Sequence, residues 1–373
     1  MYRQVHWIVQ AVLWLCMALL LSTASAQTKP QPKQATFEIT NTFTVKVPDD
    51  AKHMRIWFAV PQHDAESKIQ NFKVEAPHAV TYGTDSQGNK VGYLDLQQPK
   101  GEQIVIQETF KLTRSEILGH VDAAATRPLT EDEKAAMADS LKPSTYVIVN
   151  DDMKALAAQI VGAETNPITM ARKLYDWTLE NIEYWVKDPD HLKASSVGST
   201  EYCLRTKTGN CTDFHSLYTS LARAAGLPSR IVYGSLLKPT LNGMDVDASY
   251  HCWVQVYAPN IDWLTLDVAV ADIYTSGVKV NDKNAKLMEL TTAVGYKGAD
   301  PEMIDYYFGN LDERRVVWSV GRDLQMEPVQ EAGPVNALPK MYVEVDGKAY
   351  DDWTRKLTYR EVPHSISGKI LTH

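Results

Sequence analysis

Cys211, His251 and Asp267 have the residue types, and the order along the chain, that nucleophilic acyl transfer requires. In such a site a thiol attacks a carbonyl carbon, with an imidazole and a carboxylate as its partners. Cys211 stands at the predicted start of a helix, and His251 and Asp267 stand on two predicted strands that follow it. The pattern therefore predicts an enzyme with Cys211 as its candidate nucleophile.

The helix that positions Cys211 is the best-marked element of the sequence. Asn210 is a suitable N-cap, Asp213 can complete a capping box, and Gly226 ends the apolar periodicity. A free thiol has a pKa of ~8.5, but the positive end of a helix favours its thiolate form. The free N–H groups of the first turn can also donate to a developing oxyanion. Asp213 opposes the thiolate unless the cap engages its carboxylate.

His251 and Asp267 can meet if their strands form an antiparallel hairpin. With residues 258–262 as the loop, Asp267 lies opposite Trp253. His251 is then a diagonal neighbour of Asp267 on the same face of the sheet. A loop one residue shorter or longer would turn Asp267 to the other face. The predicted site therefore depends on this register.

Four segments, taken in order, resemble the transglutaminase-like superfamily, and in particular its exported bacterial members with an N-terminal β-domain. The resemblance is strong over residues 165–275, and the segments that carry it are 209–217, 221–230, 250–253 and 263–267. One departure is Val268, which follows Asp267 where family members often have proline.

The resemblance implies a papain-like α+β core, in which the cysteine lies at a helix N-terminus packed on an antiparallel sheet. It also implies that Cys211 is the nucleophile, His251 the general base and acid, and Asp267 the residue that orients the imidazole. The expected substrate is a protein or peptide.

The chain divides into regions of different pattern. Short segments of alternating apolar and polar residues come first, followed by a charged connector and then by the region that holds the motifs. The α+β architecture begins with an all-β domain, sandwich-like in its many short strands. The predicted parts are a signal peptide (1–26), an N-terminal all-β domain (27–115), a connector (116–150), the transglutaminase-like core (151–300) and a C-terminal β-rich extension (301–373).

The first residues are typical of a secretory signal. Arg3 precedes an apolar run, and Ala24 and Ala26 form a small-residue cleavage pattern that predicts removal after Ala26. The run is short for a membrane span, and no other segment approaches ~20 apolar residues. We expect a periplasmic or secreted protein that is not inserted in the membrane after cleavage. The full chain has a net charge of −8, and removal of Arg3 with the signal makes the mature protein one unit more negative, which argues against a nucleic-acid partner.

Three cysteines remain after Cys16 leaves with the signal. If Cys211 stays free, Cys203 and Cys252 are the only internal pair, but three reduced thiols fit the sequence equally well. With His215 these residues could also suggest a metal site, but their spacing matches no common zinc motif. We therefore predict neither metal nor cofactor, and a packed, hydrogen-bonded role for His215.

The acyl acceptor separates the possible functions. Water would make the protein a cysteine protease or amidase, and an amine would make it a protein-crosslinking transglutaminase. Hydrolysis is favoured because nothing in the sequence marks a lysine-binding or calcium site. The alternative of another class is a non-catalytic binding or scaffold module of the same fold.

Overall fold

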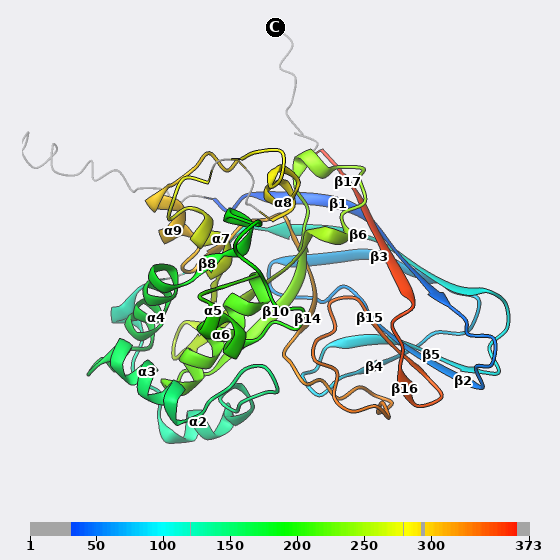
Figure 1. The fold of residues 1–373 in the computed structure, drawn as a ribbon, viewed down its shortest axis with the longest axis horizontal. Coiled ribbons are helices and arrows are strands. Elements are labelled where there is room, and N and C mark those ends of the chain that lie inside the picture. The colour runs from blue at the N-terminus through cyan, green and yellow to red at the C-terminus, as the bar shows by residue number, and fades with distance from the viewer. Residues whose placement is uncertain (1–30, 120, 279, 292–294, 364–373) are drawn as a thin grey trace, which may run out of the picture. The chain divides into compact units, whose positions relative to one another are not determined.

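The computed structural model describes residues 31–119, 121–278, 280–291 and 295–363. All described helices and strands lie in the unit Lys33–His373 (Figure 1). The predicted signal peptide, residues 1–26, lies outside the described residues. Within the described ranges, no helix combines the length and the apolar character needed to cross a membrane.

Two antiparallel sheets form a β-domain from the N-terminal strands and the end of the chain. Alternating burial along β1 places Phe37, Ile39 and Phe43 in the interior. The sheet orders are β17-β1-β6-β3 and β16-β15-β2-β5-β4. Their strands are β1 (Gln34–Lys46), β2 (His53–Ala59), β3 (Ser67–Glu75), β4 (Thr81–Thr84), β5 (Lys90–Gln97), β6 (Gln103–Ser115), β15 (Met341–Val345), β16 (Lys348–Ala349) and β17 (Trp353–Glu361).

The C-terminal strands complete sheets begun by the N-terminal region. β17 pairs antiparallel with β1, and β15 pairs antiparallel with β2. The segment 301–373, expected as an extension of its own, therefore adds its last three strands to the β-domain. The predicted connector 116–150 contains β7 (Ile117–Leu118) and α2 (Glu131–Ala136). The domain boundaries themselves remain predictions.

A second region packs helices on the four-stranded antiparallel sheet β12-β11-β10-β14. The sheet strands are β10 (Ser229–Leu236), β11 (Tyr250–Ala258), β12 (Asp262–Leu266) and β14 (Arg315–Val320). The helices are α3 (Asp151–Val161), α4 (Pro167–Asn181), α5 (Thr200–Thr206), α6 (Cys211–Ala224), α7 (Val268–Ile273), α8 (Ala285–Thr291) and α9 (Pro301–Tyr306). Short pairs join β8 (Glu183–Tyr184) to β9 (Thr208–Gly209), and β7 to β13 (Asn310–Leu311).

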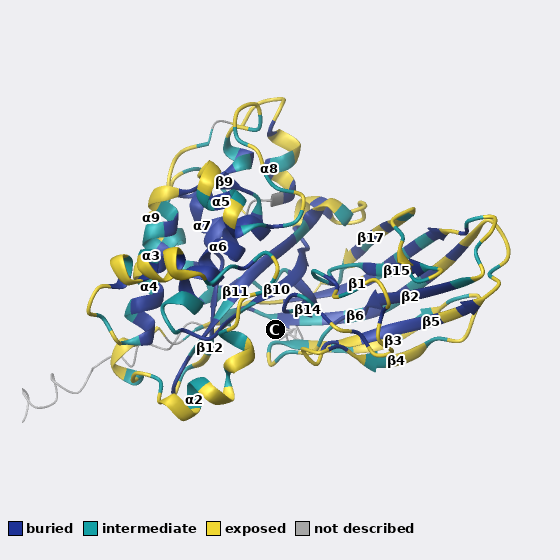
Figure 2. Ribbon diagram, turned by 60° about the horizontal axis from the view of Figure 1, so that its bottom comes forward, coloured by how far each residue is buried: buried dark blue, intermediate teal, exposed yellow. Residues whose placement is uncertain are grey.

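Helix α6 is the buried centre of this region, as Figure 2 shows. Its residues from Cys211 to Ala222 are all buried, because α3, α4, α5, α7 and the strands β10 and β11 surround it. A helix buried on every side must satisfy its polar side chains internally. Several polar residues of α6 are held by partners outside the helix: Asp213 binds Ser195, Ser216 binds the Gly198 carbonyl, Tyr218 binds the Ala171 carbonyl and Ser220 binds Thr200. These contacts make the helix a rigid support for a site at its first turn.

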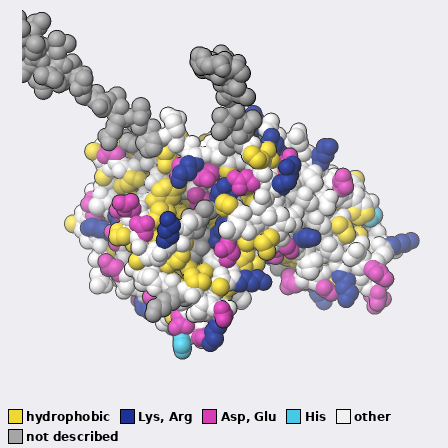
Figure 3. Space-filling view, turned by 90° about the horizontal axis from the view of Figure 1, so that it is seen from above, with side chains coloured by type: hydrophobic (Ala, Val, Ile, Leu, Met, Phe, Trp, Pro, Cys, Tyr) yellow, Lys and Arg dark blue, Asp and Glu magenta, His cyan; other side chains and the backbone are white. Residues whose placement is uncertain are grey.

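Strand β14 connects the core sheet to the β-domain. Trp318 of β14 packs edge-on against Phe110 of β6, with ring centroids 6.1 Å apart. Both rings belong to one apolar cluster that also contains Phe37 and Leu237. On the surface, Figure 3 shows acidic and basic side chains interspersed over one face, which presents no large region of a single charge.

Candidate active site

Cys211 is the first residue of α6 and is only 5% exposed. The predicted capping box is present: Asn210 Oδ1 accepts from the N–H groups of Thr212 and Asp213, and Asp213 accepts from the N–H of Asn210. The cap does not use the N–H of Cys211. That group is therefore the helix-terminal donor closest to the sulfur along the chain.

Asp213 is fully buried and binds more than the cap. Its carboxylate accepts hydrogen bonds from the N–H groups of Ser195 and Ser199 and from the Ser195 hydroxyl. Burial raises the pKa of Asp213, and these hydrogen bonds oppose that rise. With its lone pairs engaged, Asp213 anchors the loop 195–199 to the helix start.

The hairpin of β11 and β12 has the register expected from the sequence. Val254 pairs with Leu266, and the pairing continues to Ala258 and Asp262, so the loop is shorter than the five residues assumed. Asp267 follows β12 directly and caps α7, where it accepts from the N–H of Val270 at 3.1 Å.

His251 and Asp267 lie in direct contact. Nε2 of His251 is 2.9 Å from Oδ2 and 3.1 Å from Oδ1 of Asp267, and both side chains are buried. The other ring nitrogen, Nδ1, is buried and has no hydrogen-bond partner at normal distance among the described residues. The charge of His251 acts on Cys211, so Nδ1 is the nitrogen available to the thiol.

The electrostatics favour a thiolate paired with an imidazolium. A hydrogen bond from Cys252 lowers the pKa of Cys211; burial opposes it, but His251 lowers the pKa further, to well below its ordinary value. Burial lowers the pKa of His251, but the charge of Asp267 outweighs this and raises the pKa to about 9. Around neutral pH the pair is therefore charged, which is the reactive form of a cysteine nucleophile.

A second thiol and a second imidazole lie beside this pair, and the sequence did not single them out as site residues. Sγ of Cys252 is 3.3 Å from Nδ1 of His215 and 3.6 Å from the hydroxyl of Thr212. Nε2 of His215 is 3.7 Å from Oδ1 of Asp267. Burial lowers the pKa of His215 to about 4, so this ring is neutral at neutral pH. The i, i+4 spacing of Cys211 and His215 was the available signal.

All three described cysteines carry free thiols. The pairing of Cys203 with Cys252 that the sequence allowed is not formed, because the Cys252 sulfur lies between His215 and Thr212 instead. Burial raises the pKa of Cys203 and of Cys252 well above the ordinary thiol value. In the described part of the chain, no group of three or more His, Cys, Asp or Glu residues is arranged to hold a metal ion.

Arg315 is a further charged residue at the site, and sequence reasoning missed it. Its Nη1 lies 2.6 Å from Oδ2 of Asp267, and its Nη2 lies 2.8 Å from Oδ2 of Asp312. Burial raises the pKa of Asp267, but His251 and Arg315 outweigh it and hold the pKa well below the ordinary value. An arginine at the start of a mainly apolar strand was the local signal.

A cavity of about 270 Å³ is lined by Asn210, Thr212, Tyr233 and Tyr250. The hydroxyls of Thr212 and Tyr250 lie 2.9 Å apart. This cavity is the candidate approach to Cys211, since two of its lining residues flank that cysteine in the chain.

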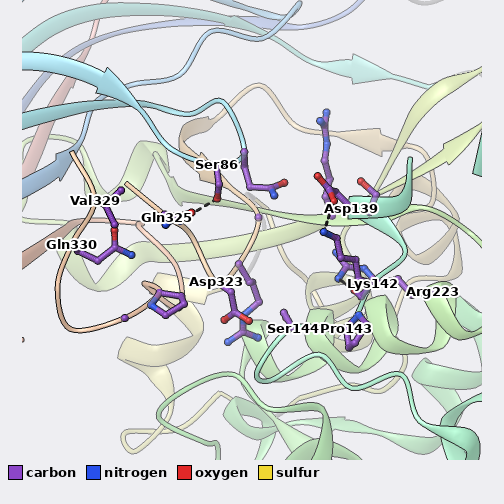
Figure 4. Close-up of a pocket in the computed structure, with 17 residues that line it drawn as sticks. Ser86, Asp139, Lys142, Pro143, Ser144, Arg223, Asp323, Gln325, Val329 and Gln330 are labelled. Carbon is purple, nitrogen blue, oxygen red and sulfur yellow. Dashed lines mark hydrogen bonds and ion pairs between the residues drawn. The ribbon is translucent and has the colours of Figure 1, made fainter. Parts of the chain in front are cut away.

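A larger cavity, of about 430 Å³, lies elsewhere and is shown in Figure 4. Arg223, Asp323 and Lys142 line it, and the three predicted site residues do not. The guanidinium of Arg223 donates to the carbonyl oxygens of Lys142 and Ser229. Its charge is thus already used to join neighbouring segments.

Comparison with known proteins agrees with this architecture. Residues 154–268 match the family model of the transglutaminase-like superfamily. A candidate cysteine protease from Cytophaga hutchinsonii has a similar structure, with a TM-score of 0.56 and 16% sequence identity, covering 90% of this chain and 93% of that chain. At that identity the likeness shows the fold alone.

Two sequence relatives cover different shares of the chain. An uncharacterised protein of Haemophilus influenzae is 25% identical over 348 residues, which are 86% of this chain and 88% of that protein. A protein-glutamine gamma-glutamyltransferase of Pseudomonas aeruginosa is 28% identical over 123 residues, which are 32% of this chain but only 18% of that protein.

The fold and the family match define the class of protein. The fold is α+β, with a strand-rich N-terminal region, as the sequence predicted. Residues 154–268 form a domain that matches the transglutaminase-like superfamily, as the resemblance indicated. Its members are typically cysteine hydrolases or acyltransferases that act on protein substrates.

Proposed function

We propose that this protein is a cysteine hydrolase that cleaves a peptide or carboxamide bond. Cys211 is the nucleophile, His251 the general base and acid, and Asp267 the group that orients the imidazole. The observation that carries the proposal is the 2.9 Å contact from His251 Nε2 to Asp267 beside a cysteine at the start of α6. That contact leaves Nδ1 of the same ring for the thiol.

The reaction proceeds in two halves. The Cys211 thiolate attacks the carbonyl carbon, and the N–H of Cys211 at the helix start donates to the resulting oxyanion. The His251 imidazolium gives its proton to the leaving amine, so that the C–N bond breaks and a thioester remains. His251 then takes a proton from water, which attacks the thioester and releases the acid and the Cys211 sulfur.

An amine acceptor in the second half would make the same site a protein-crosslinking transglutaminase. The observation that favours this alternative is the match to the gamma-glutamyltransferase of Pseudomonas aeruginosa. A non-catalytic scaffold of the same fold is the remaining alternative, and the retained contact of His251 with Asp267 argues against it. In each case the partner is a protein or peptide, and we propose that the chain acts after export to the periplasm or the exterior.

Alkylation of the purified mature chain with iodoacetamide tests the nucleophile. We expect Cys211 to be labelled already at about pH 6, because its pKa is lowered. Cys203 and Cys252 should stay unlabelled there, because burial raises the pKa of each. Peptide mapping by mass spectrometry identifies the labelled residue. Labelling of Cys211 only above pH ~8.5 would favour the scaffold.

Turnover distinguishes the acceptors. A glutamine-containing peptide is incubated with and without a fluorescent primary amine, and released ammonia, new carboxylate and incorporated amine are measured. Hydrolysis in the presence of the amine supports the proposal, whereas preferential amine incorporation supports the transglutaminase. Cys211→Ala should abolish both reactions, and Cys203→Ala is the matched control that should leave them unchanged.

A further inference from the structure

Arg315 is the first residue of β14 and lies outside the matched domain, 154–268. Its side chain is fully buried and contacts two carboxylates. Nη1 is 2.6 Å from Oδ2 of Asp267, while Nε and Nη2 are 3.0 and 2.8 Å from Oδ2 of Asp312. A guanidinium is always protonated in proteins, so it places a permanent positive charge beside Asp267.

The contacts of Asp267 fix both of its oxygens. Oδ2 accepts from Nη1 of Arg315 and from Nε2 of His251, and Oδ1 accepts from the N–H of Val270. These donors come from β14, β11 and the first turn of α7, so they hold the carboxylate from three directions. A carboxylate held in this way cannot rotate without losing at least two charge-assisted bonds. The ring of His251 is thereby kept with Nδ1 free for Cys211.

We propose that Arg315 is a positioning residue of the acyl-transfer site, which holds the Asp267 carboxylate against Nε2 of His251. The functional unit therefore extends through β14, beyond the segment that the family match covers. This inference rests on the proposed function. Arg315 acts through Asp267 and not on the reacting atoms.

A purely structural role for Arg315 makes a different prediction. The guanidinium could serve only to neutralise Asp312, or to pack over the ring of Trp253, whose centroid is 5.2 Å away. In that role, a protein in which Asp312 is already neutral would no longer need the charge of Arg315. Asp312→Asn therefore provides the background in which the two roles separate.

The experiment compares four variants of the mature chain: Asp312→Asn alone, the same background with Arg315→Met or with Arg315→Lys, and Arg314→Met. Arg314 is the matched control, because its guanidinium binds Glu361 and the Leu237 carbonyl. Circular dichroism and thermal melting establish that each variant is folded. The readouts are kcat and KM for a glutamine-containing peptide from pH 4 to 10, with the iodoacetamide labelling rate of Cys211.

We expect Asp312→Asn and Arg314→Met to stay within about twofold of the parent protein. Adding Arg315→Met should lower kcat by about 100-fold, the scale of a small misplacement of a catalytic group, and leave KM unchanged. Arg315→Lys should recover part of that loss, because an ammonium can replace the single bond to Asp267. Cys211 should still be labelled in every variant, since its sulfur is untouched.

The pH profile gives a readout that a structural role would not move. Burial raises the pKa of Asp267, and the charges of His251 and Arg315 lower it. Removing Arg315 raises the pKa of Asp267, so the acid limb of kcat should move to higher pH, and Arg315→Lys should move it back. Asp312 also acts on Asp267, but it is Asn both in the Arg315 variants and in the Asp312→Asn reference, so it does not contribute to their difference. The other ionisable side chains that interact with Asp267 are unchanged in these variants: His251, His215, Cys252, Tyr175, Tyr184, Tyr274 and Tyr307.

Several outcomes would overturn the inference. Equal kcat and equal acid limbs for Asp312→Asn with and without Arg315→Met would show that Arg315 serves Asp312 alone. If the Met variant does not fold, Arg315→Lys decides, and a folded Lys variant with the same kcat and the same acid limb as Asp312→Asn rejects the positioning role. If Cys211 of the parent protein is not labelled at pH 6 and the parent protein does not turn over the peptide, the proposed function is rejected, and the inference with it. Normal labelling and turnover with no effect of Arg315 reject the inference only.

Discussion

Glu108 of the β-domain and Asp267 of the core are both completely buried carboxylates, but their surroundings differ. Glu108 accepts a hydrogen bond from Asn41 Nδ2 at 2.6 Å, and the guanidinium of Arg355 binds the other end of Asn41. Burial dominates, although Asn41 and the charge of Arg355 oppose it, and raises the pKa of Glu108 to about 8. At neutral pH this residue holds a proton. Asp267, with His251 and Arg315 in direct contact, is ionised.

Asp272 of α7 lies between these extremes. Its Oδ2 is 2.8 Å from Nζ of Lys187, and both side chains are nearly inaccessible to solvent. Burial raises the pKa of Asp272, Lys187 opposes it, and the result is about 6. The pKa of the three carboxylates therefore falls as the number of cations in direct contact rises: none at Glu108, one at Asp272 and two at Asp267. Burial raises the pKa of all three acids, and the two cations in contact with Asp267 lower its pKa well below the ordinary value.

The largest expected effect is the loss of turnover when Asp267 is neutralised, and the same kind of change at Glu108 is its control. Asp267→Asn should lower kcat by about 10³- to 10⁴-fold, because the imidazole loses its orienting charge. Glu108→Gln should leave kcat unchanged, because that side chain is already neutral and lies in the β-domain. Turnover of the glutamine-containing peptide measures both. Equal losses in the two variants would mean that the activity reports folding and not the site.

The next effect concerns the intermediate case. Lys187→Met removes the single cation in contact with Asp272, so the pKa of Asp272 should rise above about 6. Breaking a buried ion pair on one side costs about 3 kcal/mol of unfolding free energy. Urea denaturation at pH 7 and pH 5 measures the loss, which should shrink at pH 5 because Asp272 is then protonated. A loss of unfolding free energy that is the same at both pH values would contradict the claim that Lys187 lowers the pKa of Asp272.

A further effect is a pH dependence of stability set by Glu108, which should leave turnover unchanged. Its pKa is raised from 4.5 to about 8 in the folded protein, so between these values the unfolded chain releases a proton that the folded chain keeps. Its contribution to the free energy of unfolding is therefore complete below pH 4.5 and is lost as pH rises to 8. The slope is at most about 1.4 kcal/mol per pH unit.

Comparing the parent protein with Glu108→Gln isolates this contribution. Gln cannot titrate, so the difference in unfolding free energy between the two should grow in favour of Gln as pH rises from 5 to 8. Urea denaturation at several pH values checks this. A constant difference would mean that Glu108 is ionised in the folded protein, and the comparison with Asp267 would fail.

Much of the candidate site could be predicted because its signals are local. The cap of α6 depends on Asn210 and Asp213, which are three residues apart, and the structure contains it. The hairpin register depended on a short loop, and Val254 pairs with Leu266 as that register requires. The loop length was wrong, because Ala258 and Asp262 extend the pairing by one rung. That error did not change the face of Asp267, since the register stayed the same.

The sequence by itself determined which thiol stands at a helix start and which hairpin register brings His251 towards Asp267, because helix caps and hairpins are decided within a few residues. Asp267 itself was expected on the strand, but it follows β12 and caps α7. Only the tertiary structure decided that Arg315 of β14 binds Asp267, that Cys252 and His215 lie beside Cys211, and that β15 and β17 join sheets begun by β2 and β1. These contacts join segments far apart in the chain. Such contacts depend on how the packed surfaces fit and on which charges are buried, and the spacing of residues along the chain predicts neither.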